Sequence, residues 1–428
     1  MEERQRSLRE GFIATFLGNG ALALAQWATL ALIARLGSAE LLGEYALALA
    51  IATPVAMFSH LNLRAVLATD MEGRHPFGDY LVVRVATVAL GAAAVAGVAL
   101  AGGYAARVVA VIVAAGAVLA VDNLSDIYYA AMQRRERMDR IALSTAARAA
   151  LSTAALGATL WLSHNLFAAV AAQAAARLTV LLLYDRPVGG QGESMARTGA
   201  RAQLGIAGVA LPLGMVLMLL SAASSLPRYV IQRDLGMAAL GGFAAAASFM
   251  GVGATLVNAL GQAATPRLAR YFASGEDARF RRLAWQFTGI ALLLGVAGIA
   301  VALAMGRFWL SLLYGASYAA YGALLIWAMV AAVAGNLAGA LGYVITGARA
   351  FRAQAPLFAA VAASAGIAAW LLVPRMGLEG GAAALGISSC VQAAGALAIL
   401  RRAWRNRAPR GLPAGGSEGL PALAALVK

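Results

Sequence analysis

The sequence is poor in charge for its length. Charged residues make up 12% of the 428 residues, whereas hydrophobic residues make up 61%. A soluble domain carries about 25% charged residues. So little charge cannot coat a globule of this size, which excludes a soluble enzyme, a disordered tail and a coiled coil.

Reactive and metal-binding side chains are also scarce. Cys390 is the only cysteine, which excludes an intramolecular disulfide and a thiol metal site. The three histidines have no ligand spacing, and no Walker-type GKS or GKT loop occurs. We therefore expect no metal, no cofactor and no ATP site, so that energy for any transport comes from gradients or from downstream steps.

What the sequence does contain is long apolar runs. A helix crosses the roughly 30 Å bilayer core in about 20 residues. The sequence predicts an all-α polytopic membrane protein with twelve such spans. Little more than Gly102-Gly103 separates the third span from the fourth, and only Ser163-His164-Asn165 separates the fifth from the sixth. The predicted spans are 12–34, 44–68, 79–101, 105–132, 141–163, 165–184, 206–230, 237–263, 283–305, 319–346, 354–373 and 380–401.

The positive charge predicts the orientation. The net charge is +15, for which nucleic acid is one possible reason. Basic cytoplasmic loops of a membrane protein explain it better. With twelve spans, nearly all loop arginines fall on the side of the two termini, which we therefore predict to be cytoplasmic, with no nucleic-acid partner. The opposite side holds only Arg35, Arg107, Arg228, Arg233, Arg307 and Arg375.

A short motif recurs near the start of the second and eighth spans. Residues 36–43 read LGSAELLG and residues 235–241 read LGMAALG, an offset of about 198 residues, with six spans to each half. Chance recurrence of a helix cap is the alternative. The repeat predicts two six-helix lobes related by a pseudo-two-fold axis along the membrane normal. We place the N-terminal lobe at 1–190, a cytoplasmic inter-lobe linker at 191–204, the C-terminal lobe at 205–405 and a cytoplasmic tail at 406–428.

Two segments resemble a known family. Residues 32–70 (LIARLGSAELLGEYALALAIATPVAMFSHLNLRAVLATD) resemble the first two helices of Wzx-type O-antigen/polysaccharide flippases. Residues 227–276, with PRYVIQRDLGMAALGG and NALGQAATPRLA, resemble helices seven and eight of the same flippases. These flippases belong to the multidrug/oligosaccharidyl-lipid/polysaccharide (MOP) exporter superfamily.

The resemblance implies two lobes around a central cavity and a location in the bacterial inner membrane. It implies alternating-access transfer of an undecaprenyl-pyrophosphate-linked oligosaccharide for O-antigen, capsule or exopolysaccharide assembly. Its implied partners are this substrate, membrane lipids and a polysaccharide polymerase. The alternative is a MATE-like exporter of drugs or organic cations, which would need a buried carboxylate with little positive charge nearby. A membrane enzyme would need a large external loop, and because all loops are short we expect no enzyme.

Ionisable residues inside the spans are the candidate site. Each costs at least about 2.5–3.5 kcal/mol on insertion scales and so requires a reason. Arg64 and Arg84 lie about equally far from Arg74 in the hairpin of the second and third spans. The guanidinium fork suits a lipid pyrophosphate. The alternative is neutralisation by Asp70, Asp79 or lipid headgroups.

The next hairpin carries both signs of charge. Asp126 and Arg148 lie at matched depth, which predicts an ion pair or, alternatively, a proton-sensitive pair. Asp122, Asp126, Tyr129 and Gln133 share one face of the fourth span, which we expect to face a cavity or a neighbouring helix. Asp122 and Asp126 are the candidates for coupling to a gradient.

Two groups of side chains complete the prediction. The pyrophosphate-binding candidates are Arg64, Arg84, Arg148 and Arg228. Amide and hydroxyl stripes suit an oligosaccharide but are also ordinary interhelical contacts. The sugar-binding candidates are Asn19, Gln26, Asn62, Gln173, Arg177, Asn258 and Gln262.

Overall fold

The computed structural model describes residues 8–70, 74–348, 350 and 353–405, and these form helices joined by short turns. The predicted tail, 406–428, lies outside the described residues. The helices are α1 (Leu8–Leu36), α2 (Ala39–His60), α3 (Leu63–Thr69), α4 (Phe77–Ala101), α5 (Ala106–Arg134), α6 (Met138–Ser163), α7 (Leu166–Val180), π-helix η1 (Leu181–Asp185), α8 (Arg186–Gly190), α9 (Ala200–Leu235), α10 (Met237–Ser248), α11 (Met250–Ser274), α12 (Asp277–Tyr314), 3₁₀-helix η2 (Ala316–Tyr321), α13 (Gly322–Gly347), α14 (Gln354–Met376) and α15 (Leu378–Arg405).

The helices confirm the prediction of an all-helical, multi-pass membrane protein. Within the described residues, eleven helices or runs of successive helices are long and apolar enough to cross a membrane. Helix α1 would make a twelfth span, and its described apolar stretch is Gly20–Leu36. The two shortest predicted turns also occur, because α4 ends at Ala101 just before Gly102-Gly103 and α6 ends at Ser163. In the second turn, Asn165 caps α7 by accepting a hydrogen bond from the Ala168 amide at 3.1 Å.

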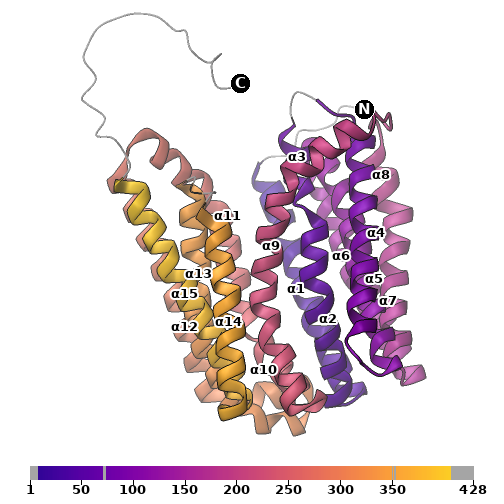
Figure 1. Ribbon diagram of the computed structural model, residues 1–428, viewed down its shortest axis with the longest axis vertical. Coiled ribbons are helices and arrows are strands. Elements are labelled where there is room, and N and C mark those ends of the chain that lie inside the picture. The colour runs from indigo at the N-terminus through magenta and orange to yellow at the C-terminus, as the bar shows by residue number, and fades with distance from the viewer. Residues whose placement is uncertain (1–7, 71–73, 349, 351–352, 406–428) are drawn as a thin grey trace, which may run out of the picture.

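The helices form two bundles (Figure 1). We call α1–α8 the N-terminal lobe and α10–α15 the C-terminal lobe. Helix α1 begins and α15 ends at the same end of the molecule, which we call the terminal end. The lobes meet at the opposite, distal end, where α10 packs against α2. The positive-inside rule predicts that the distal end is external.

Helix α9 contacts both lobes. It packs along α2 of the N-terminal lobe and along α14 of the C-terminal lobe. Its first half contributes Ile206 and Ala210 to a core with α3, α4 and α5, whereas Ala223 in its second half belongs to the core of the C-terminal lobe. The predicted lobe boundary at 205 therefore falls inside a helix that both lobes share, and α9 itself begins at Ala200.

The polar segment before α9 is fixed to the N-terminal lobe. Asp79, in the first turn of α4, is completely buried and accepts hydrogen bonds from the Thr198 amide and from Nε2 of Gln203, each at 3.1 Å. The Gly78 amide donates to the Ser194 carbonyl at 3.0 Å. Glu193 forms ion pairs with Arg134 and Arg135. The connection between the lobes therefore lies over the terminal end of the first lobe.

Replacing Asp79 by alanine is expected to release this connection. The buried carboxylate is the shared acceptor of Thr198 and Gln203, and a hydrogen bond to a charged group contributes about 1.5–3 kcal/mol. Trypsin added to the detergent-solubilised variant should cleave after Arg197 and Arg201 faster than in the wild type, while cleavage after Arg281 stays unchanged. If the variant and the wild type were cleaved at the same rate at each of the three sites, this role of Asp79 would be contradicted.

Candidate functional site

A cluster of three basic side chains surrounds Asp126 on α5. Its carboxylate lies 3.0 Å from Nε2 of His60, 3.3 Å from Nη2 of Arg84 and 3.6 Å from Nη1 of Arg64. Nε of Arg64 also donates to Oε1 of Gln133 at 2.8 Å, about two turns beyond Asp126 on α5. Asp126 therefore pairs with both arginines of the α3–α4 hairpin, for which the sequence had indicated Asp70, Asp79 or lipid headgroups as alternative partners.

Arg84 also stabilises a break between α2 and α3. Leu61 and Asn62 both have φ of 50°, in the left-handed region, so α2 ends at His60 in the middle of a span. Nη1 of Arg84 donates to the His60 carbonyl at 2.8 Å and to the Ser59 carbonyl at 3.4 Å. A cation is favourable at a helix C-terminus, where carbonyls lack helical partners.

Arg84 and Arg64 differ in what they leave accessible. Arg84 is 0% exposed, whereas the Arg64 side chain is 31% exposed. In this conformation Arg84 offers no surface to a substrate, so its position does not match the predicted contact with pyrophosphate. Arg64 does have such a surface.

A second cluster surrounds Asp122, one helical turn from Asp126. Nη2 of Arg148 lies 2.7 Å from one carboxylate oxygen of Asp122, and Nη1 of Arg177 contacts the other. The predicted pair of Asp126 with Arg148 is therefore wrong. Arg148 lies ten residues into α6 and Asp126 eight residues from the end of α5, so either aspartate is within reach of the long arginine side chain, and Arg84 already contacts Asp126.

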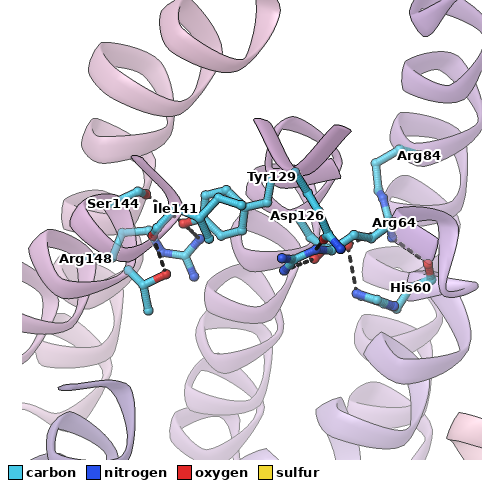
Figure 2. A network of polar contacts seen from close by, with 10 residues as sticks. His60, Arg64, Arg84, Asp126, Tyr129, Ile141, Ser144 and Arg148 are labelled. Carbon is cyan, nitrogen blue, oxygen red and sulfur yellow. Dashed lines mark hydrogen bonds and ion pairs between the residues drawn. The ribbon is translucent and has the colours of Figure 1, made fainter. Parts of the chain in front are cut away.

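Tyr129 joins the two clusters. The guanidinium carbons of Arg64 and Arg148 lie 5.8 Å and 5.7 Å from the centre of its ring, within range of a cation–π contact. Its hydroxyl accepts from Nη1 of Arg148 at 3.1 Å and lies 2.7 Å from the Ser144 hydroxyl. Figure 2 shows the resulting row of side chains, from Arg148 through Tyr129 to Asp126 and its partners.

We call these eight residues the arginine network: His60, Arg64, Arg84, Asp122, Asp126, Tyr129, Arg148 and Arg177. Its composition leaves an excess of positive charge, because four guanidinium groups face two carboxylates. Asp185 is the next carboxylate, and the excess stays positive when it is counted as ionised. Buried like charges repel each other, so this network is better suited to an anion than to a cation.

Asp185 is a participant that the sequence did not indicate. It is completely buried, and Oδ1 accepts a hydrogen bond from the Ser144 hydroxyl at 2.5 Å. Its Oδ2 has no hydrogen-bond partner among the described residues. Asp185 ends the π-helical turn η1, a distortion that often occurs at functional sites. The apolar run before it shows no sign of this turn, so the sequence placed Asp185 at the start of a loop.

The sugar-binding candidates lie outside the arginine network, with the exception of Arg177. Gln173 on α7 is 1% exposed and has no access to a cavity in this conformation. Asn62 is half-buried at the break between α2 and α3. Asn19 lies on α1, but its side chain is outside the described residues. The exposed candidates are Gln26 on α1 and Asn258 and Gln262 on α11.

Arg228 on α9 is half-buried and lies apart from the network. Its Nε has no hydrogen-bond partner, and no carboxylate among the described residues lies within ion-pairing distance of its guanidinium group. A cation inside a span without a partner is energetically unfavourable and marks a candidate binding residue. Within the described part of the chain, no group of three His, Cys, Asp or Glu residues is placed to hold a metal ion.

Comparisons with known proteins indicate the fold. No protein-family model matches the chain. The capsular polysaccharide biosynthesis protein CapF of Staphylococcus aureus is 23% identical over 322 residues, which cover 74% of this chain and 80% of that protein.

Solved structures are similar over almost the whole chain. A mutant of the Vibrio cholerae MATE transporter VcmN has a TM-score of 0.66 at 15% identity, covering 94% of this chain and 97% of that one. An inward-facing multidrug resistance MATE transporter of the MOP superfamily has a TM-score of 0.61 at 13% identity, covering 94% and 96%. A Pyrococcus furiosus MOP-superfamily transporter, described as having a binding pocket of reverse polarity, has a TM-score of 0.58 at 15% identity, covering 92% and 94%.

Proposed function

We propose that this chain, which has the fold of the MOP-superfamily transporters, is a flippase for a polyprenyl-pyrophosphate-linked oligosaccharide. The observation that carries the proposal is the excess of arginine over carboxylate in the arginine network. A pyrophosphate carries the opposite charge, and guanidinium groups bind phosphate oxygens through paired N–H donors. The resemblance to the polysaccharide flippases and the similarity to CapF support the same substrate class.

The physical task is to carry a sugar–pyrophosphate head through roughly 30 Å of hydrocarbon. In the proposal, Arg64 makes the first contact with pyrophosphate, because it is the accessible arginine around Asp126. Arg148 and Arg177 supply further positive charge behind it, and Arg228 on α9 provides an unpaired cation outside the network. Gln26, Asn258 and Gln262 would contact sugars, while the prenyl tail stays in lipid.

The proposed location is the bacterial inner membrane, with both termini in the cytoplasm. The positive-inside rule supports this orientation, because the loops at the terminal end hold most of the arginines. The proposed partners beyond the substrate are membrane lipids and a polysaccharide polymerase that uses the flipped oligosaccharide. O-antigen, capsule and exopolysaccharide assembly all require such a step.

A gradient could drive the transfer through the aspartates of α5. Asp126 is the stronger candidate, since a proton on its carboxyl group would weaken its contacts with His60, Arg64 and Arg84 together. An inward proton gradient is then expected to speed transport by the wild type and to leave Asp126→Asn unaffected, because the amide cannot take up the proton. The measurement is the transport rate with and without the proton gradient, in vesicles that hold equal amounts of folded wild-type or variant protein. If the gradient accelerated the variant as much as the wild type, Asp126 would not be the coupling residue.

An exporter of organic cations is the second candidate, because the similar solved structures include multidrug MATE transporters. Such a site would need a carboxylate free of nearby arginines. Asp122 and Asp126 each contact two arginines, which disfavours a bound cation. The charge of the network therefore supports the flippase over the exporter.

Deletion of the gene in its host tests the proposal. We expect the undecaprenyl-linked oligosaccharide to accumulate on the cytoplasmic leaflet, with no surface polymer, and the wild-type gene to restore export. Normal surface polymer with altered sensitivity to cationic compounds would favour the exporter instead.

A further inference from the structure

The distal end holds a reciprocal contact between the two lobes that involves two glycines. Gly43 is in the second turn of α2, and Gly241 is in the second turn of α10. A Cβ atom built on Gly43 would overlap the Met237 carbonyl oxygen and lie 3.2 Å from the Gly241 amide. A Cβ atom built on Gly241 would overlap the Ala39 carbonyl oxygen and lie 3.1 Å from the Gly43 amide.

The contact follows the internal repeat. Gly43 and Gly241 are separated by the repeat offset of about 198 residues, and Ala39 and Met237 are separated by the same offset. Gly43 therefore faces Met237, and Gly241 faces Ala39, which is the residue equivalent to Met237 in the other lobe. The backbones of α2 and α10 approach so closely only because neither residue carries a side chain.

Two further contacts join the lobes, and like the glycine contact they lie on the distal side of the arginine network. Nε of Arg35, in the last turn of α1, donates to the Leu313 carbonyl at 2.9 Å, in the last turn of α12. Nε1 of Trp27 on α1 donates to the Ser248 carbonyl at 3.2 Å, where α10 gives way to α11. The ring of Trp27 also packs on that of Phe249, with centroids 5.1 Å apart.

Trp27 and Arg35 donate the side-chain hydrogen bonds between the two lobes. Apart from those of α9 and the segment before it, no other side-chain hydrogen bond between described residues links the N-terminal lobe to the C-terminal lobe. Helix α9, by contrast, packs against both lobes along its length. The conformation is closed at the distal end by backbone contact, by Arg35 and by an aromatic pair.

We infer that Gly43 and Gly241 form the closing contact of a distal gate, whose strength sets how often the distal end opens. A rocking of one lobe against the other must separate α2 from α10, since both helices lie in the lobe interface. Any side chain at either glycine pushes the two backbones apart and so favours the distally open conformation. This inference does not depend on the substrate of the transporter.

Distance measurement between spin labels tests the gate without substrate. The reporter positions are Glu40 and Ala238, exposed residues in the first turns of α2 and α10, changed to cysteine in a Cys390→Ala background. Gly43→Ala and Gly241→Ala are each introduced, with Gly97→Ala as the matched control. Gly97 also lies within a span, but a Cβ atom there has no neighbour within 4 Å.

The expected result is a shift of the main population to a longer distance in both gate variants and not in the control. We expect the ratio of closed to open molecules to fall at least about tenfold, which corresponds to about 1.4 kcal/mol. If one glycine variant does not fold, Arg35→Ala weakens the same gate through the bond to α12 and should lengthen the distance in the same direction. Distance distributions that match the control in all folded variants would overturn the inference.

Discussion

Arg64→Ala is expected to reduce transport of a pyrophosphate-linked oligosaccharide about 10- to 100-fold while the protein remains folded. The loss corresponds to the roughly 1.5–3 kcal/mol that a hydrogen bond to a charged group contributes. Folding is expected to survive, because Arg64 makes the longest of the three contacts with Asp126, at 3.6 Å, and its side chain is partly exposed. His60 and Arg84 still contact the carboxylate in the variant.

Two controls separate charge from geometry. Arg64→Lys keeps the charge but loses the planar fork, so its transport should lie between that of the wild type and that of Arg64→Ala. Arg281→Ala removes an exposed arginine at the terminal end of the other lobe and should have no effect. Wild-type transport by the double variant Arg64→Ala/Arg148→Ala would contradict a phosphate-binding role for the network.

Arg84→Ala is expected to lower the free energy of unfolding strongly. The change takes the completely buried cation away from the half-buried Asp126 and leaves the Ser59 and His60 carbonyls without their donor. Breaking a buried ion pair by removing one partner costs about 3–5 kcal/mol. Denaturant titration of the purified protein in detergent, together with its abundance in the membrane, measures the loss.

Arg64 and Arg84 are expected to contribute differently to stability. The more exposed ion pair of Arg64 is expected to contribute no more than about 1 kcal/mol to stability. If Arg84→Ala is as stable as Arg64→Ala and yet loses transport, then Arg84 contacts substrate in another conformation, as its sequence position had suggested. If it is destabilised as expected, Arg84 acts by holding the break between α2 and α3.

The fold was largely accessible from the sequence because the bilayer fixes the length of each helix. Even the three-residue turn at Ser163-His164-Asn165 occurs as predicted, since a polar residue that can adopt the left-handed conformation and a helix-capping asparagine stand between two apolar runs. The sharing of α9 between the lobes was not accessible, because its apolar surface continues along both halves of the helix.

The candidate site was only partly accessible. Ionisable residues inside spans were identified, because each is costly in hydrocarbon and so stands out. Their pairing was not, since depth along a hairpin does not determine how each helix is rotated about its axis. Arg148 therefore contacts Asp122 where Asp126 was expected. The role of Asp185 depends on the π-helical turn, which the sequence pattern does not reveal.

Whether the protein moves a pyrophosphate-linked oligosaccharide is measured most directly with purified protein in lipid vesicles. A polyprenyl-pyrophosphate-linked oligosaccharide is incorporated, and the fraction that a membrane-impermeant oxidant can reach is followed over time, beside uptake of the fluorescent cation ethidium. We expect transbilayer movement of the oligosaccharide that requires the protein, is reduced in Arg64→Ala and is not accompanied by ethidium uptake. Protein-dependent ethidium transport without movement of the oligosaccharide would contradict this expectation.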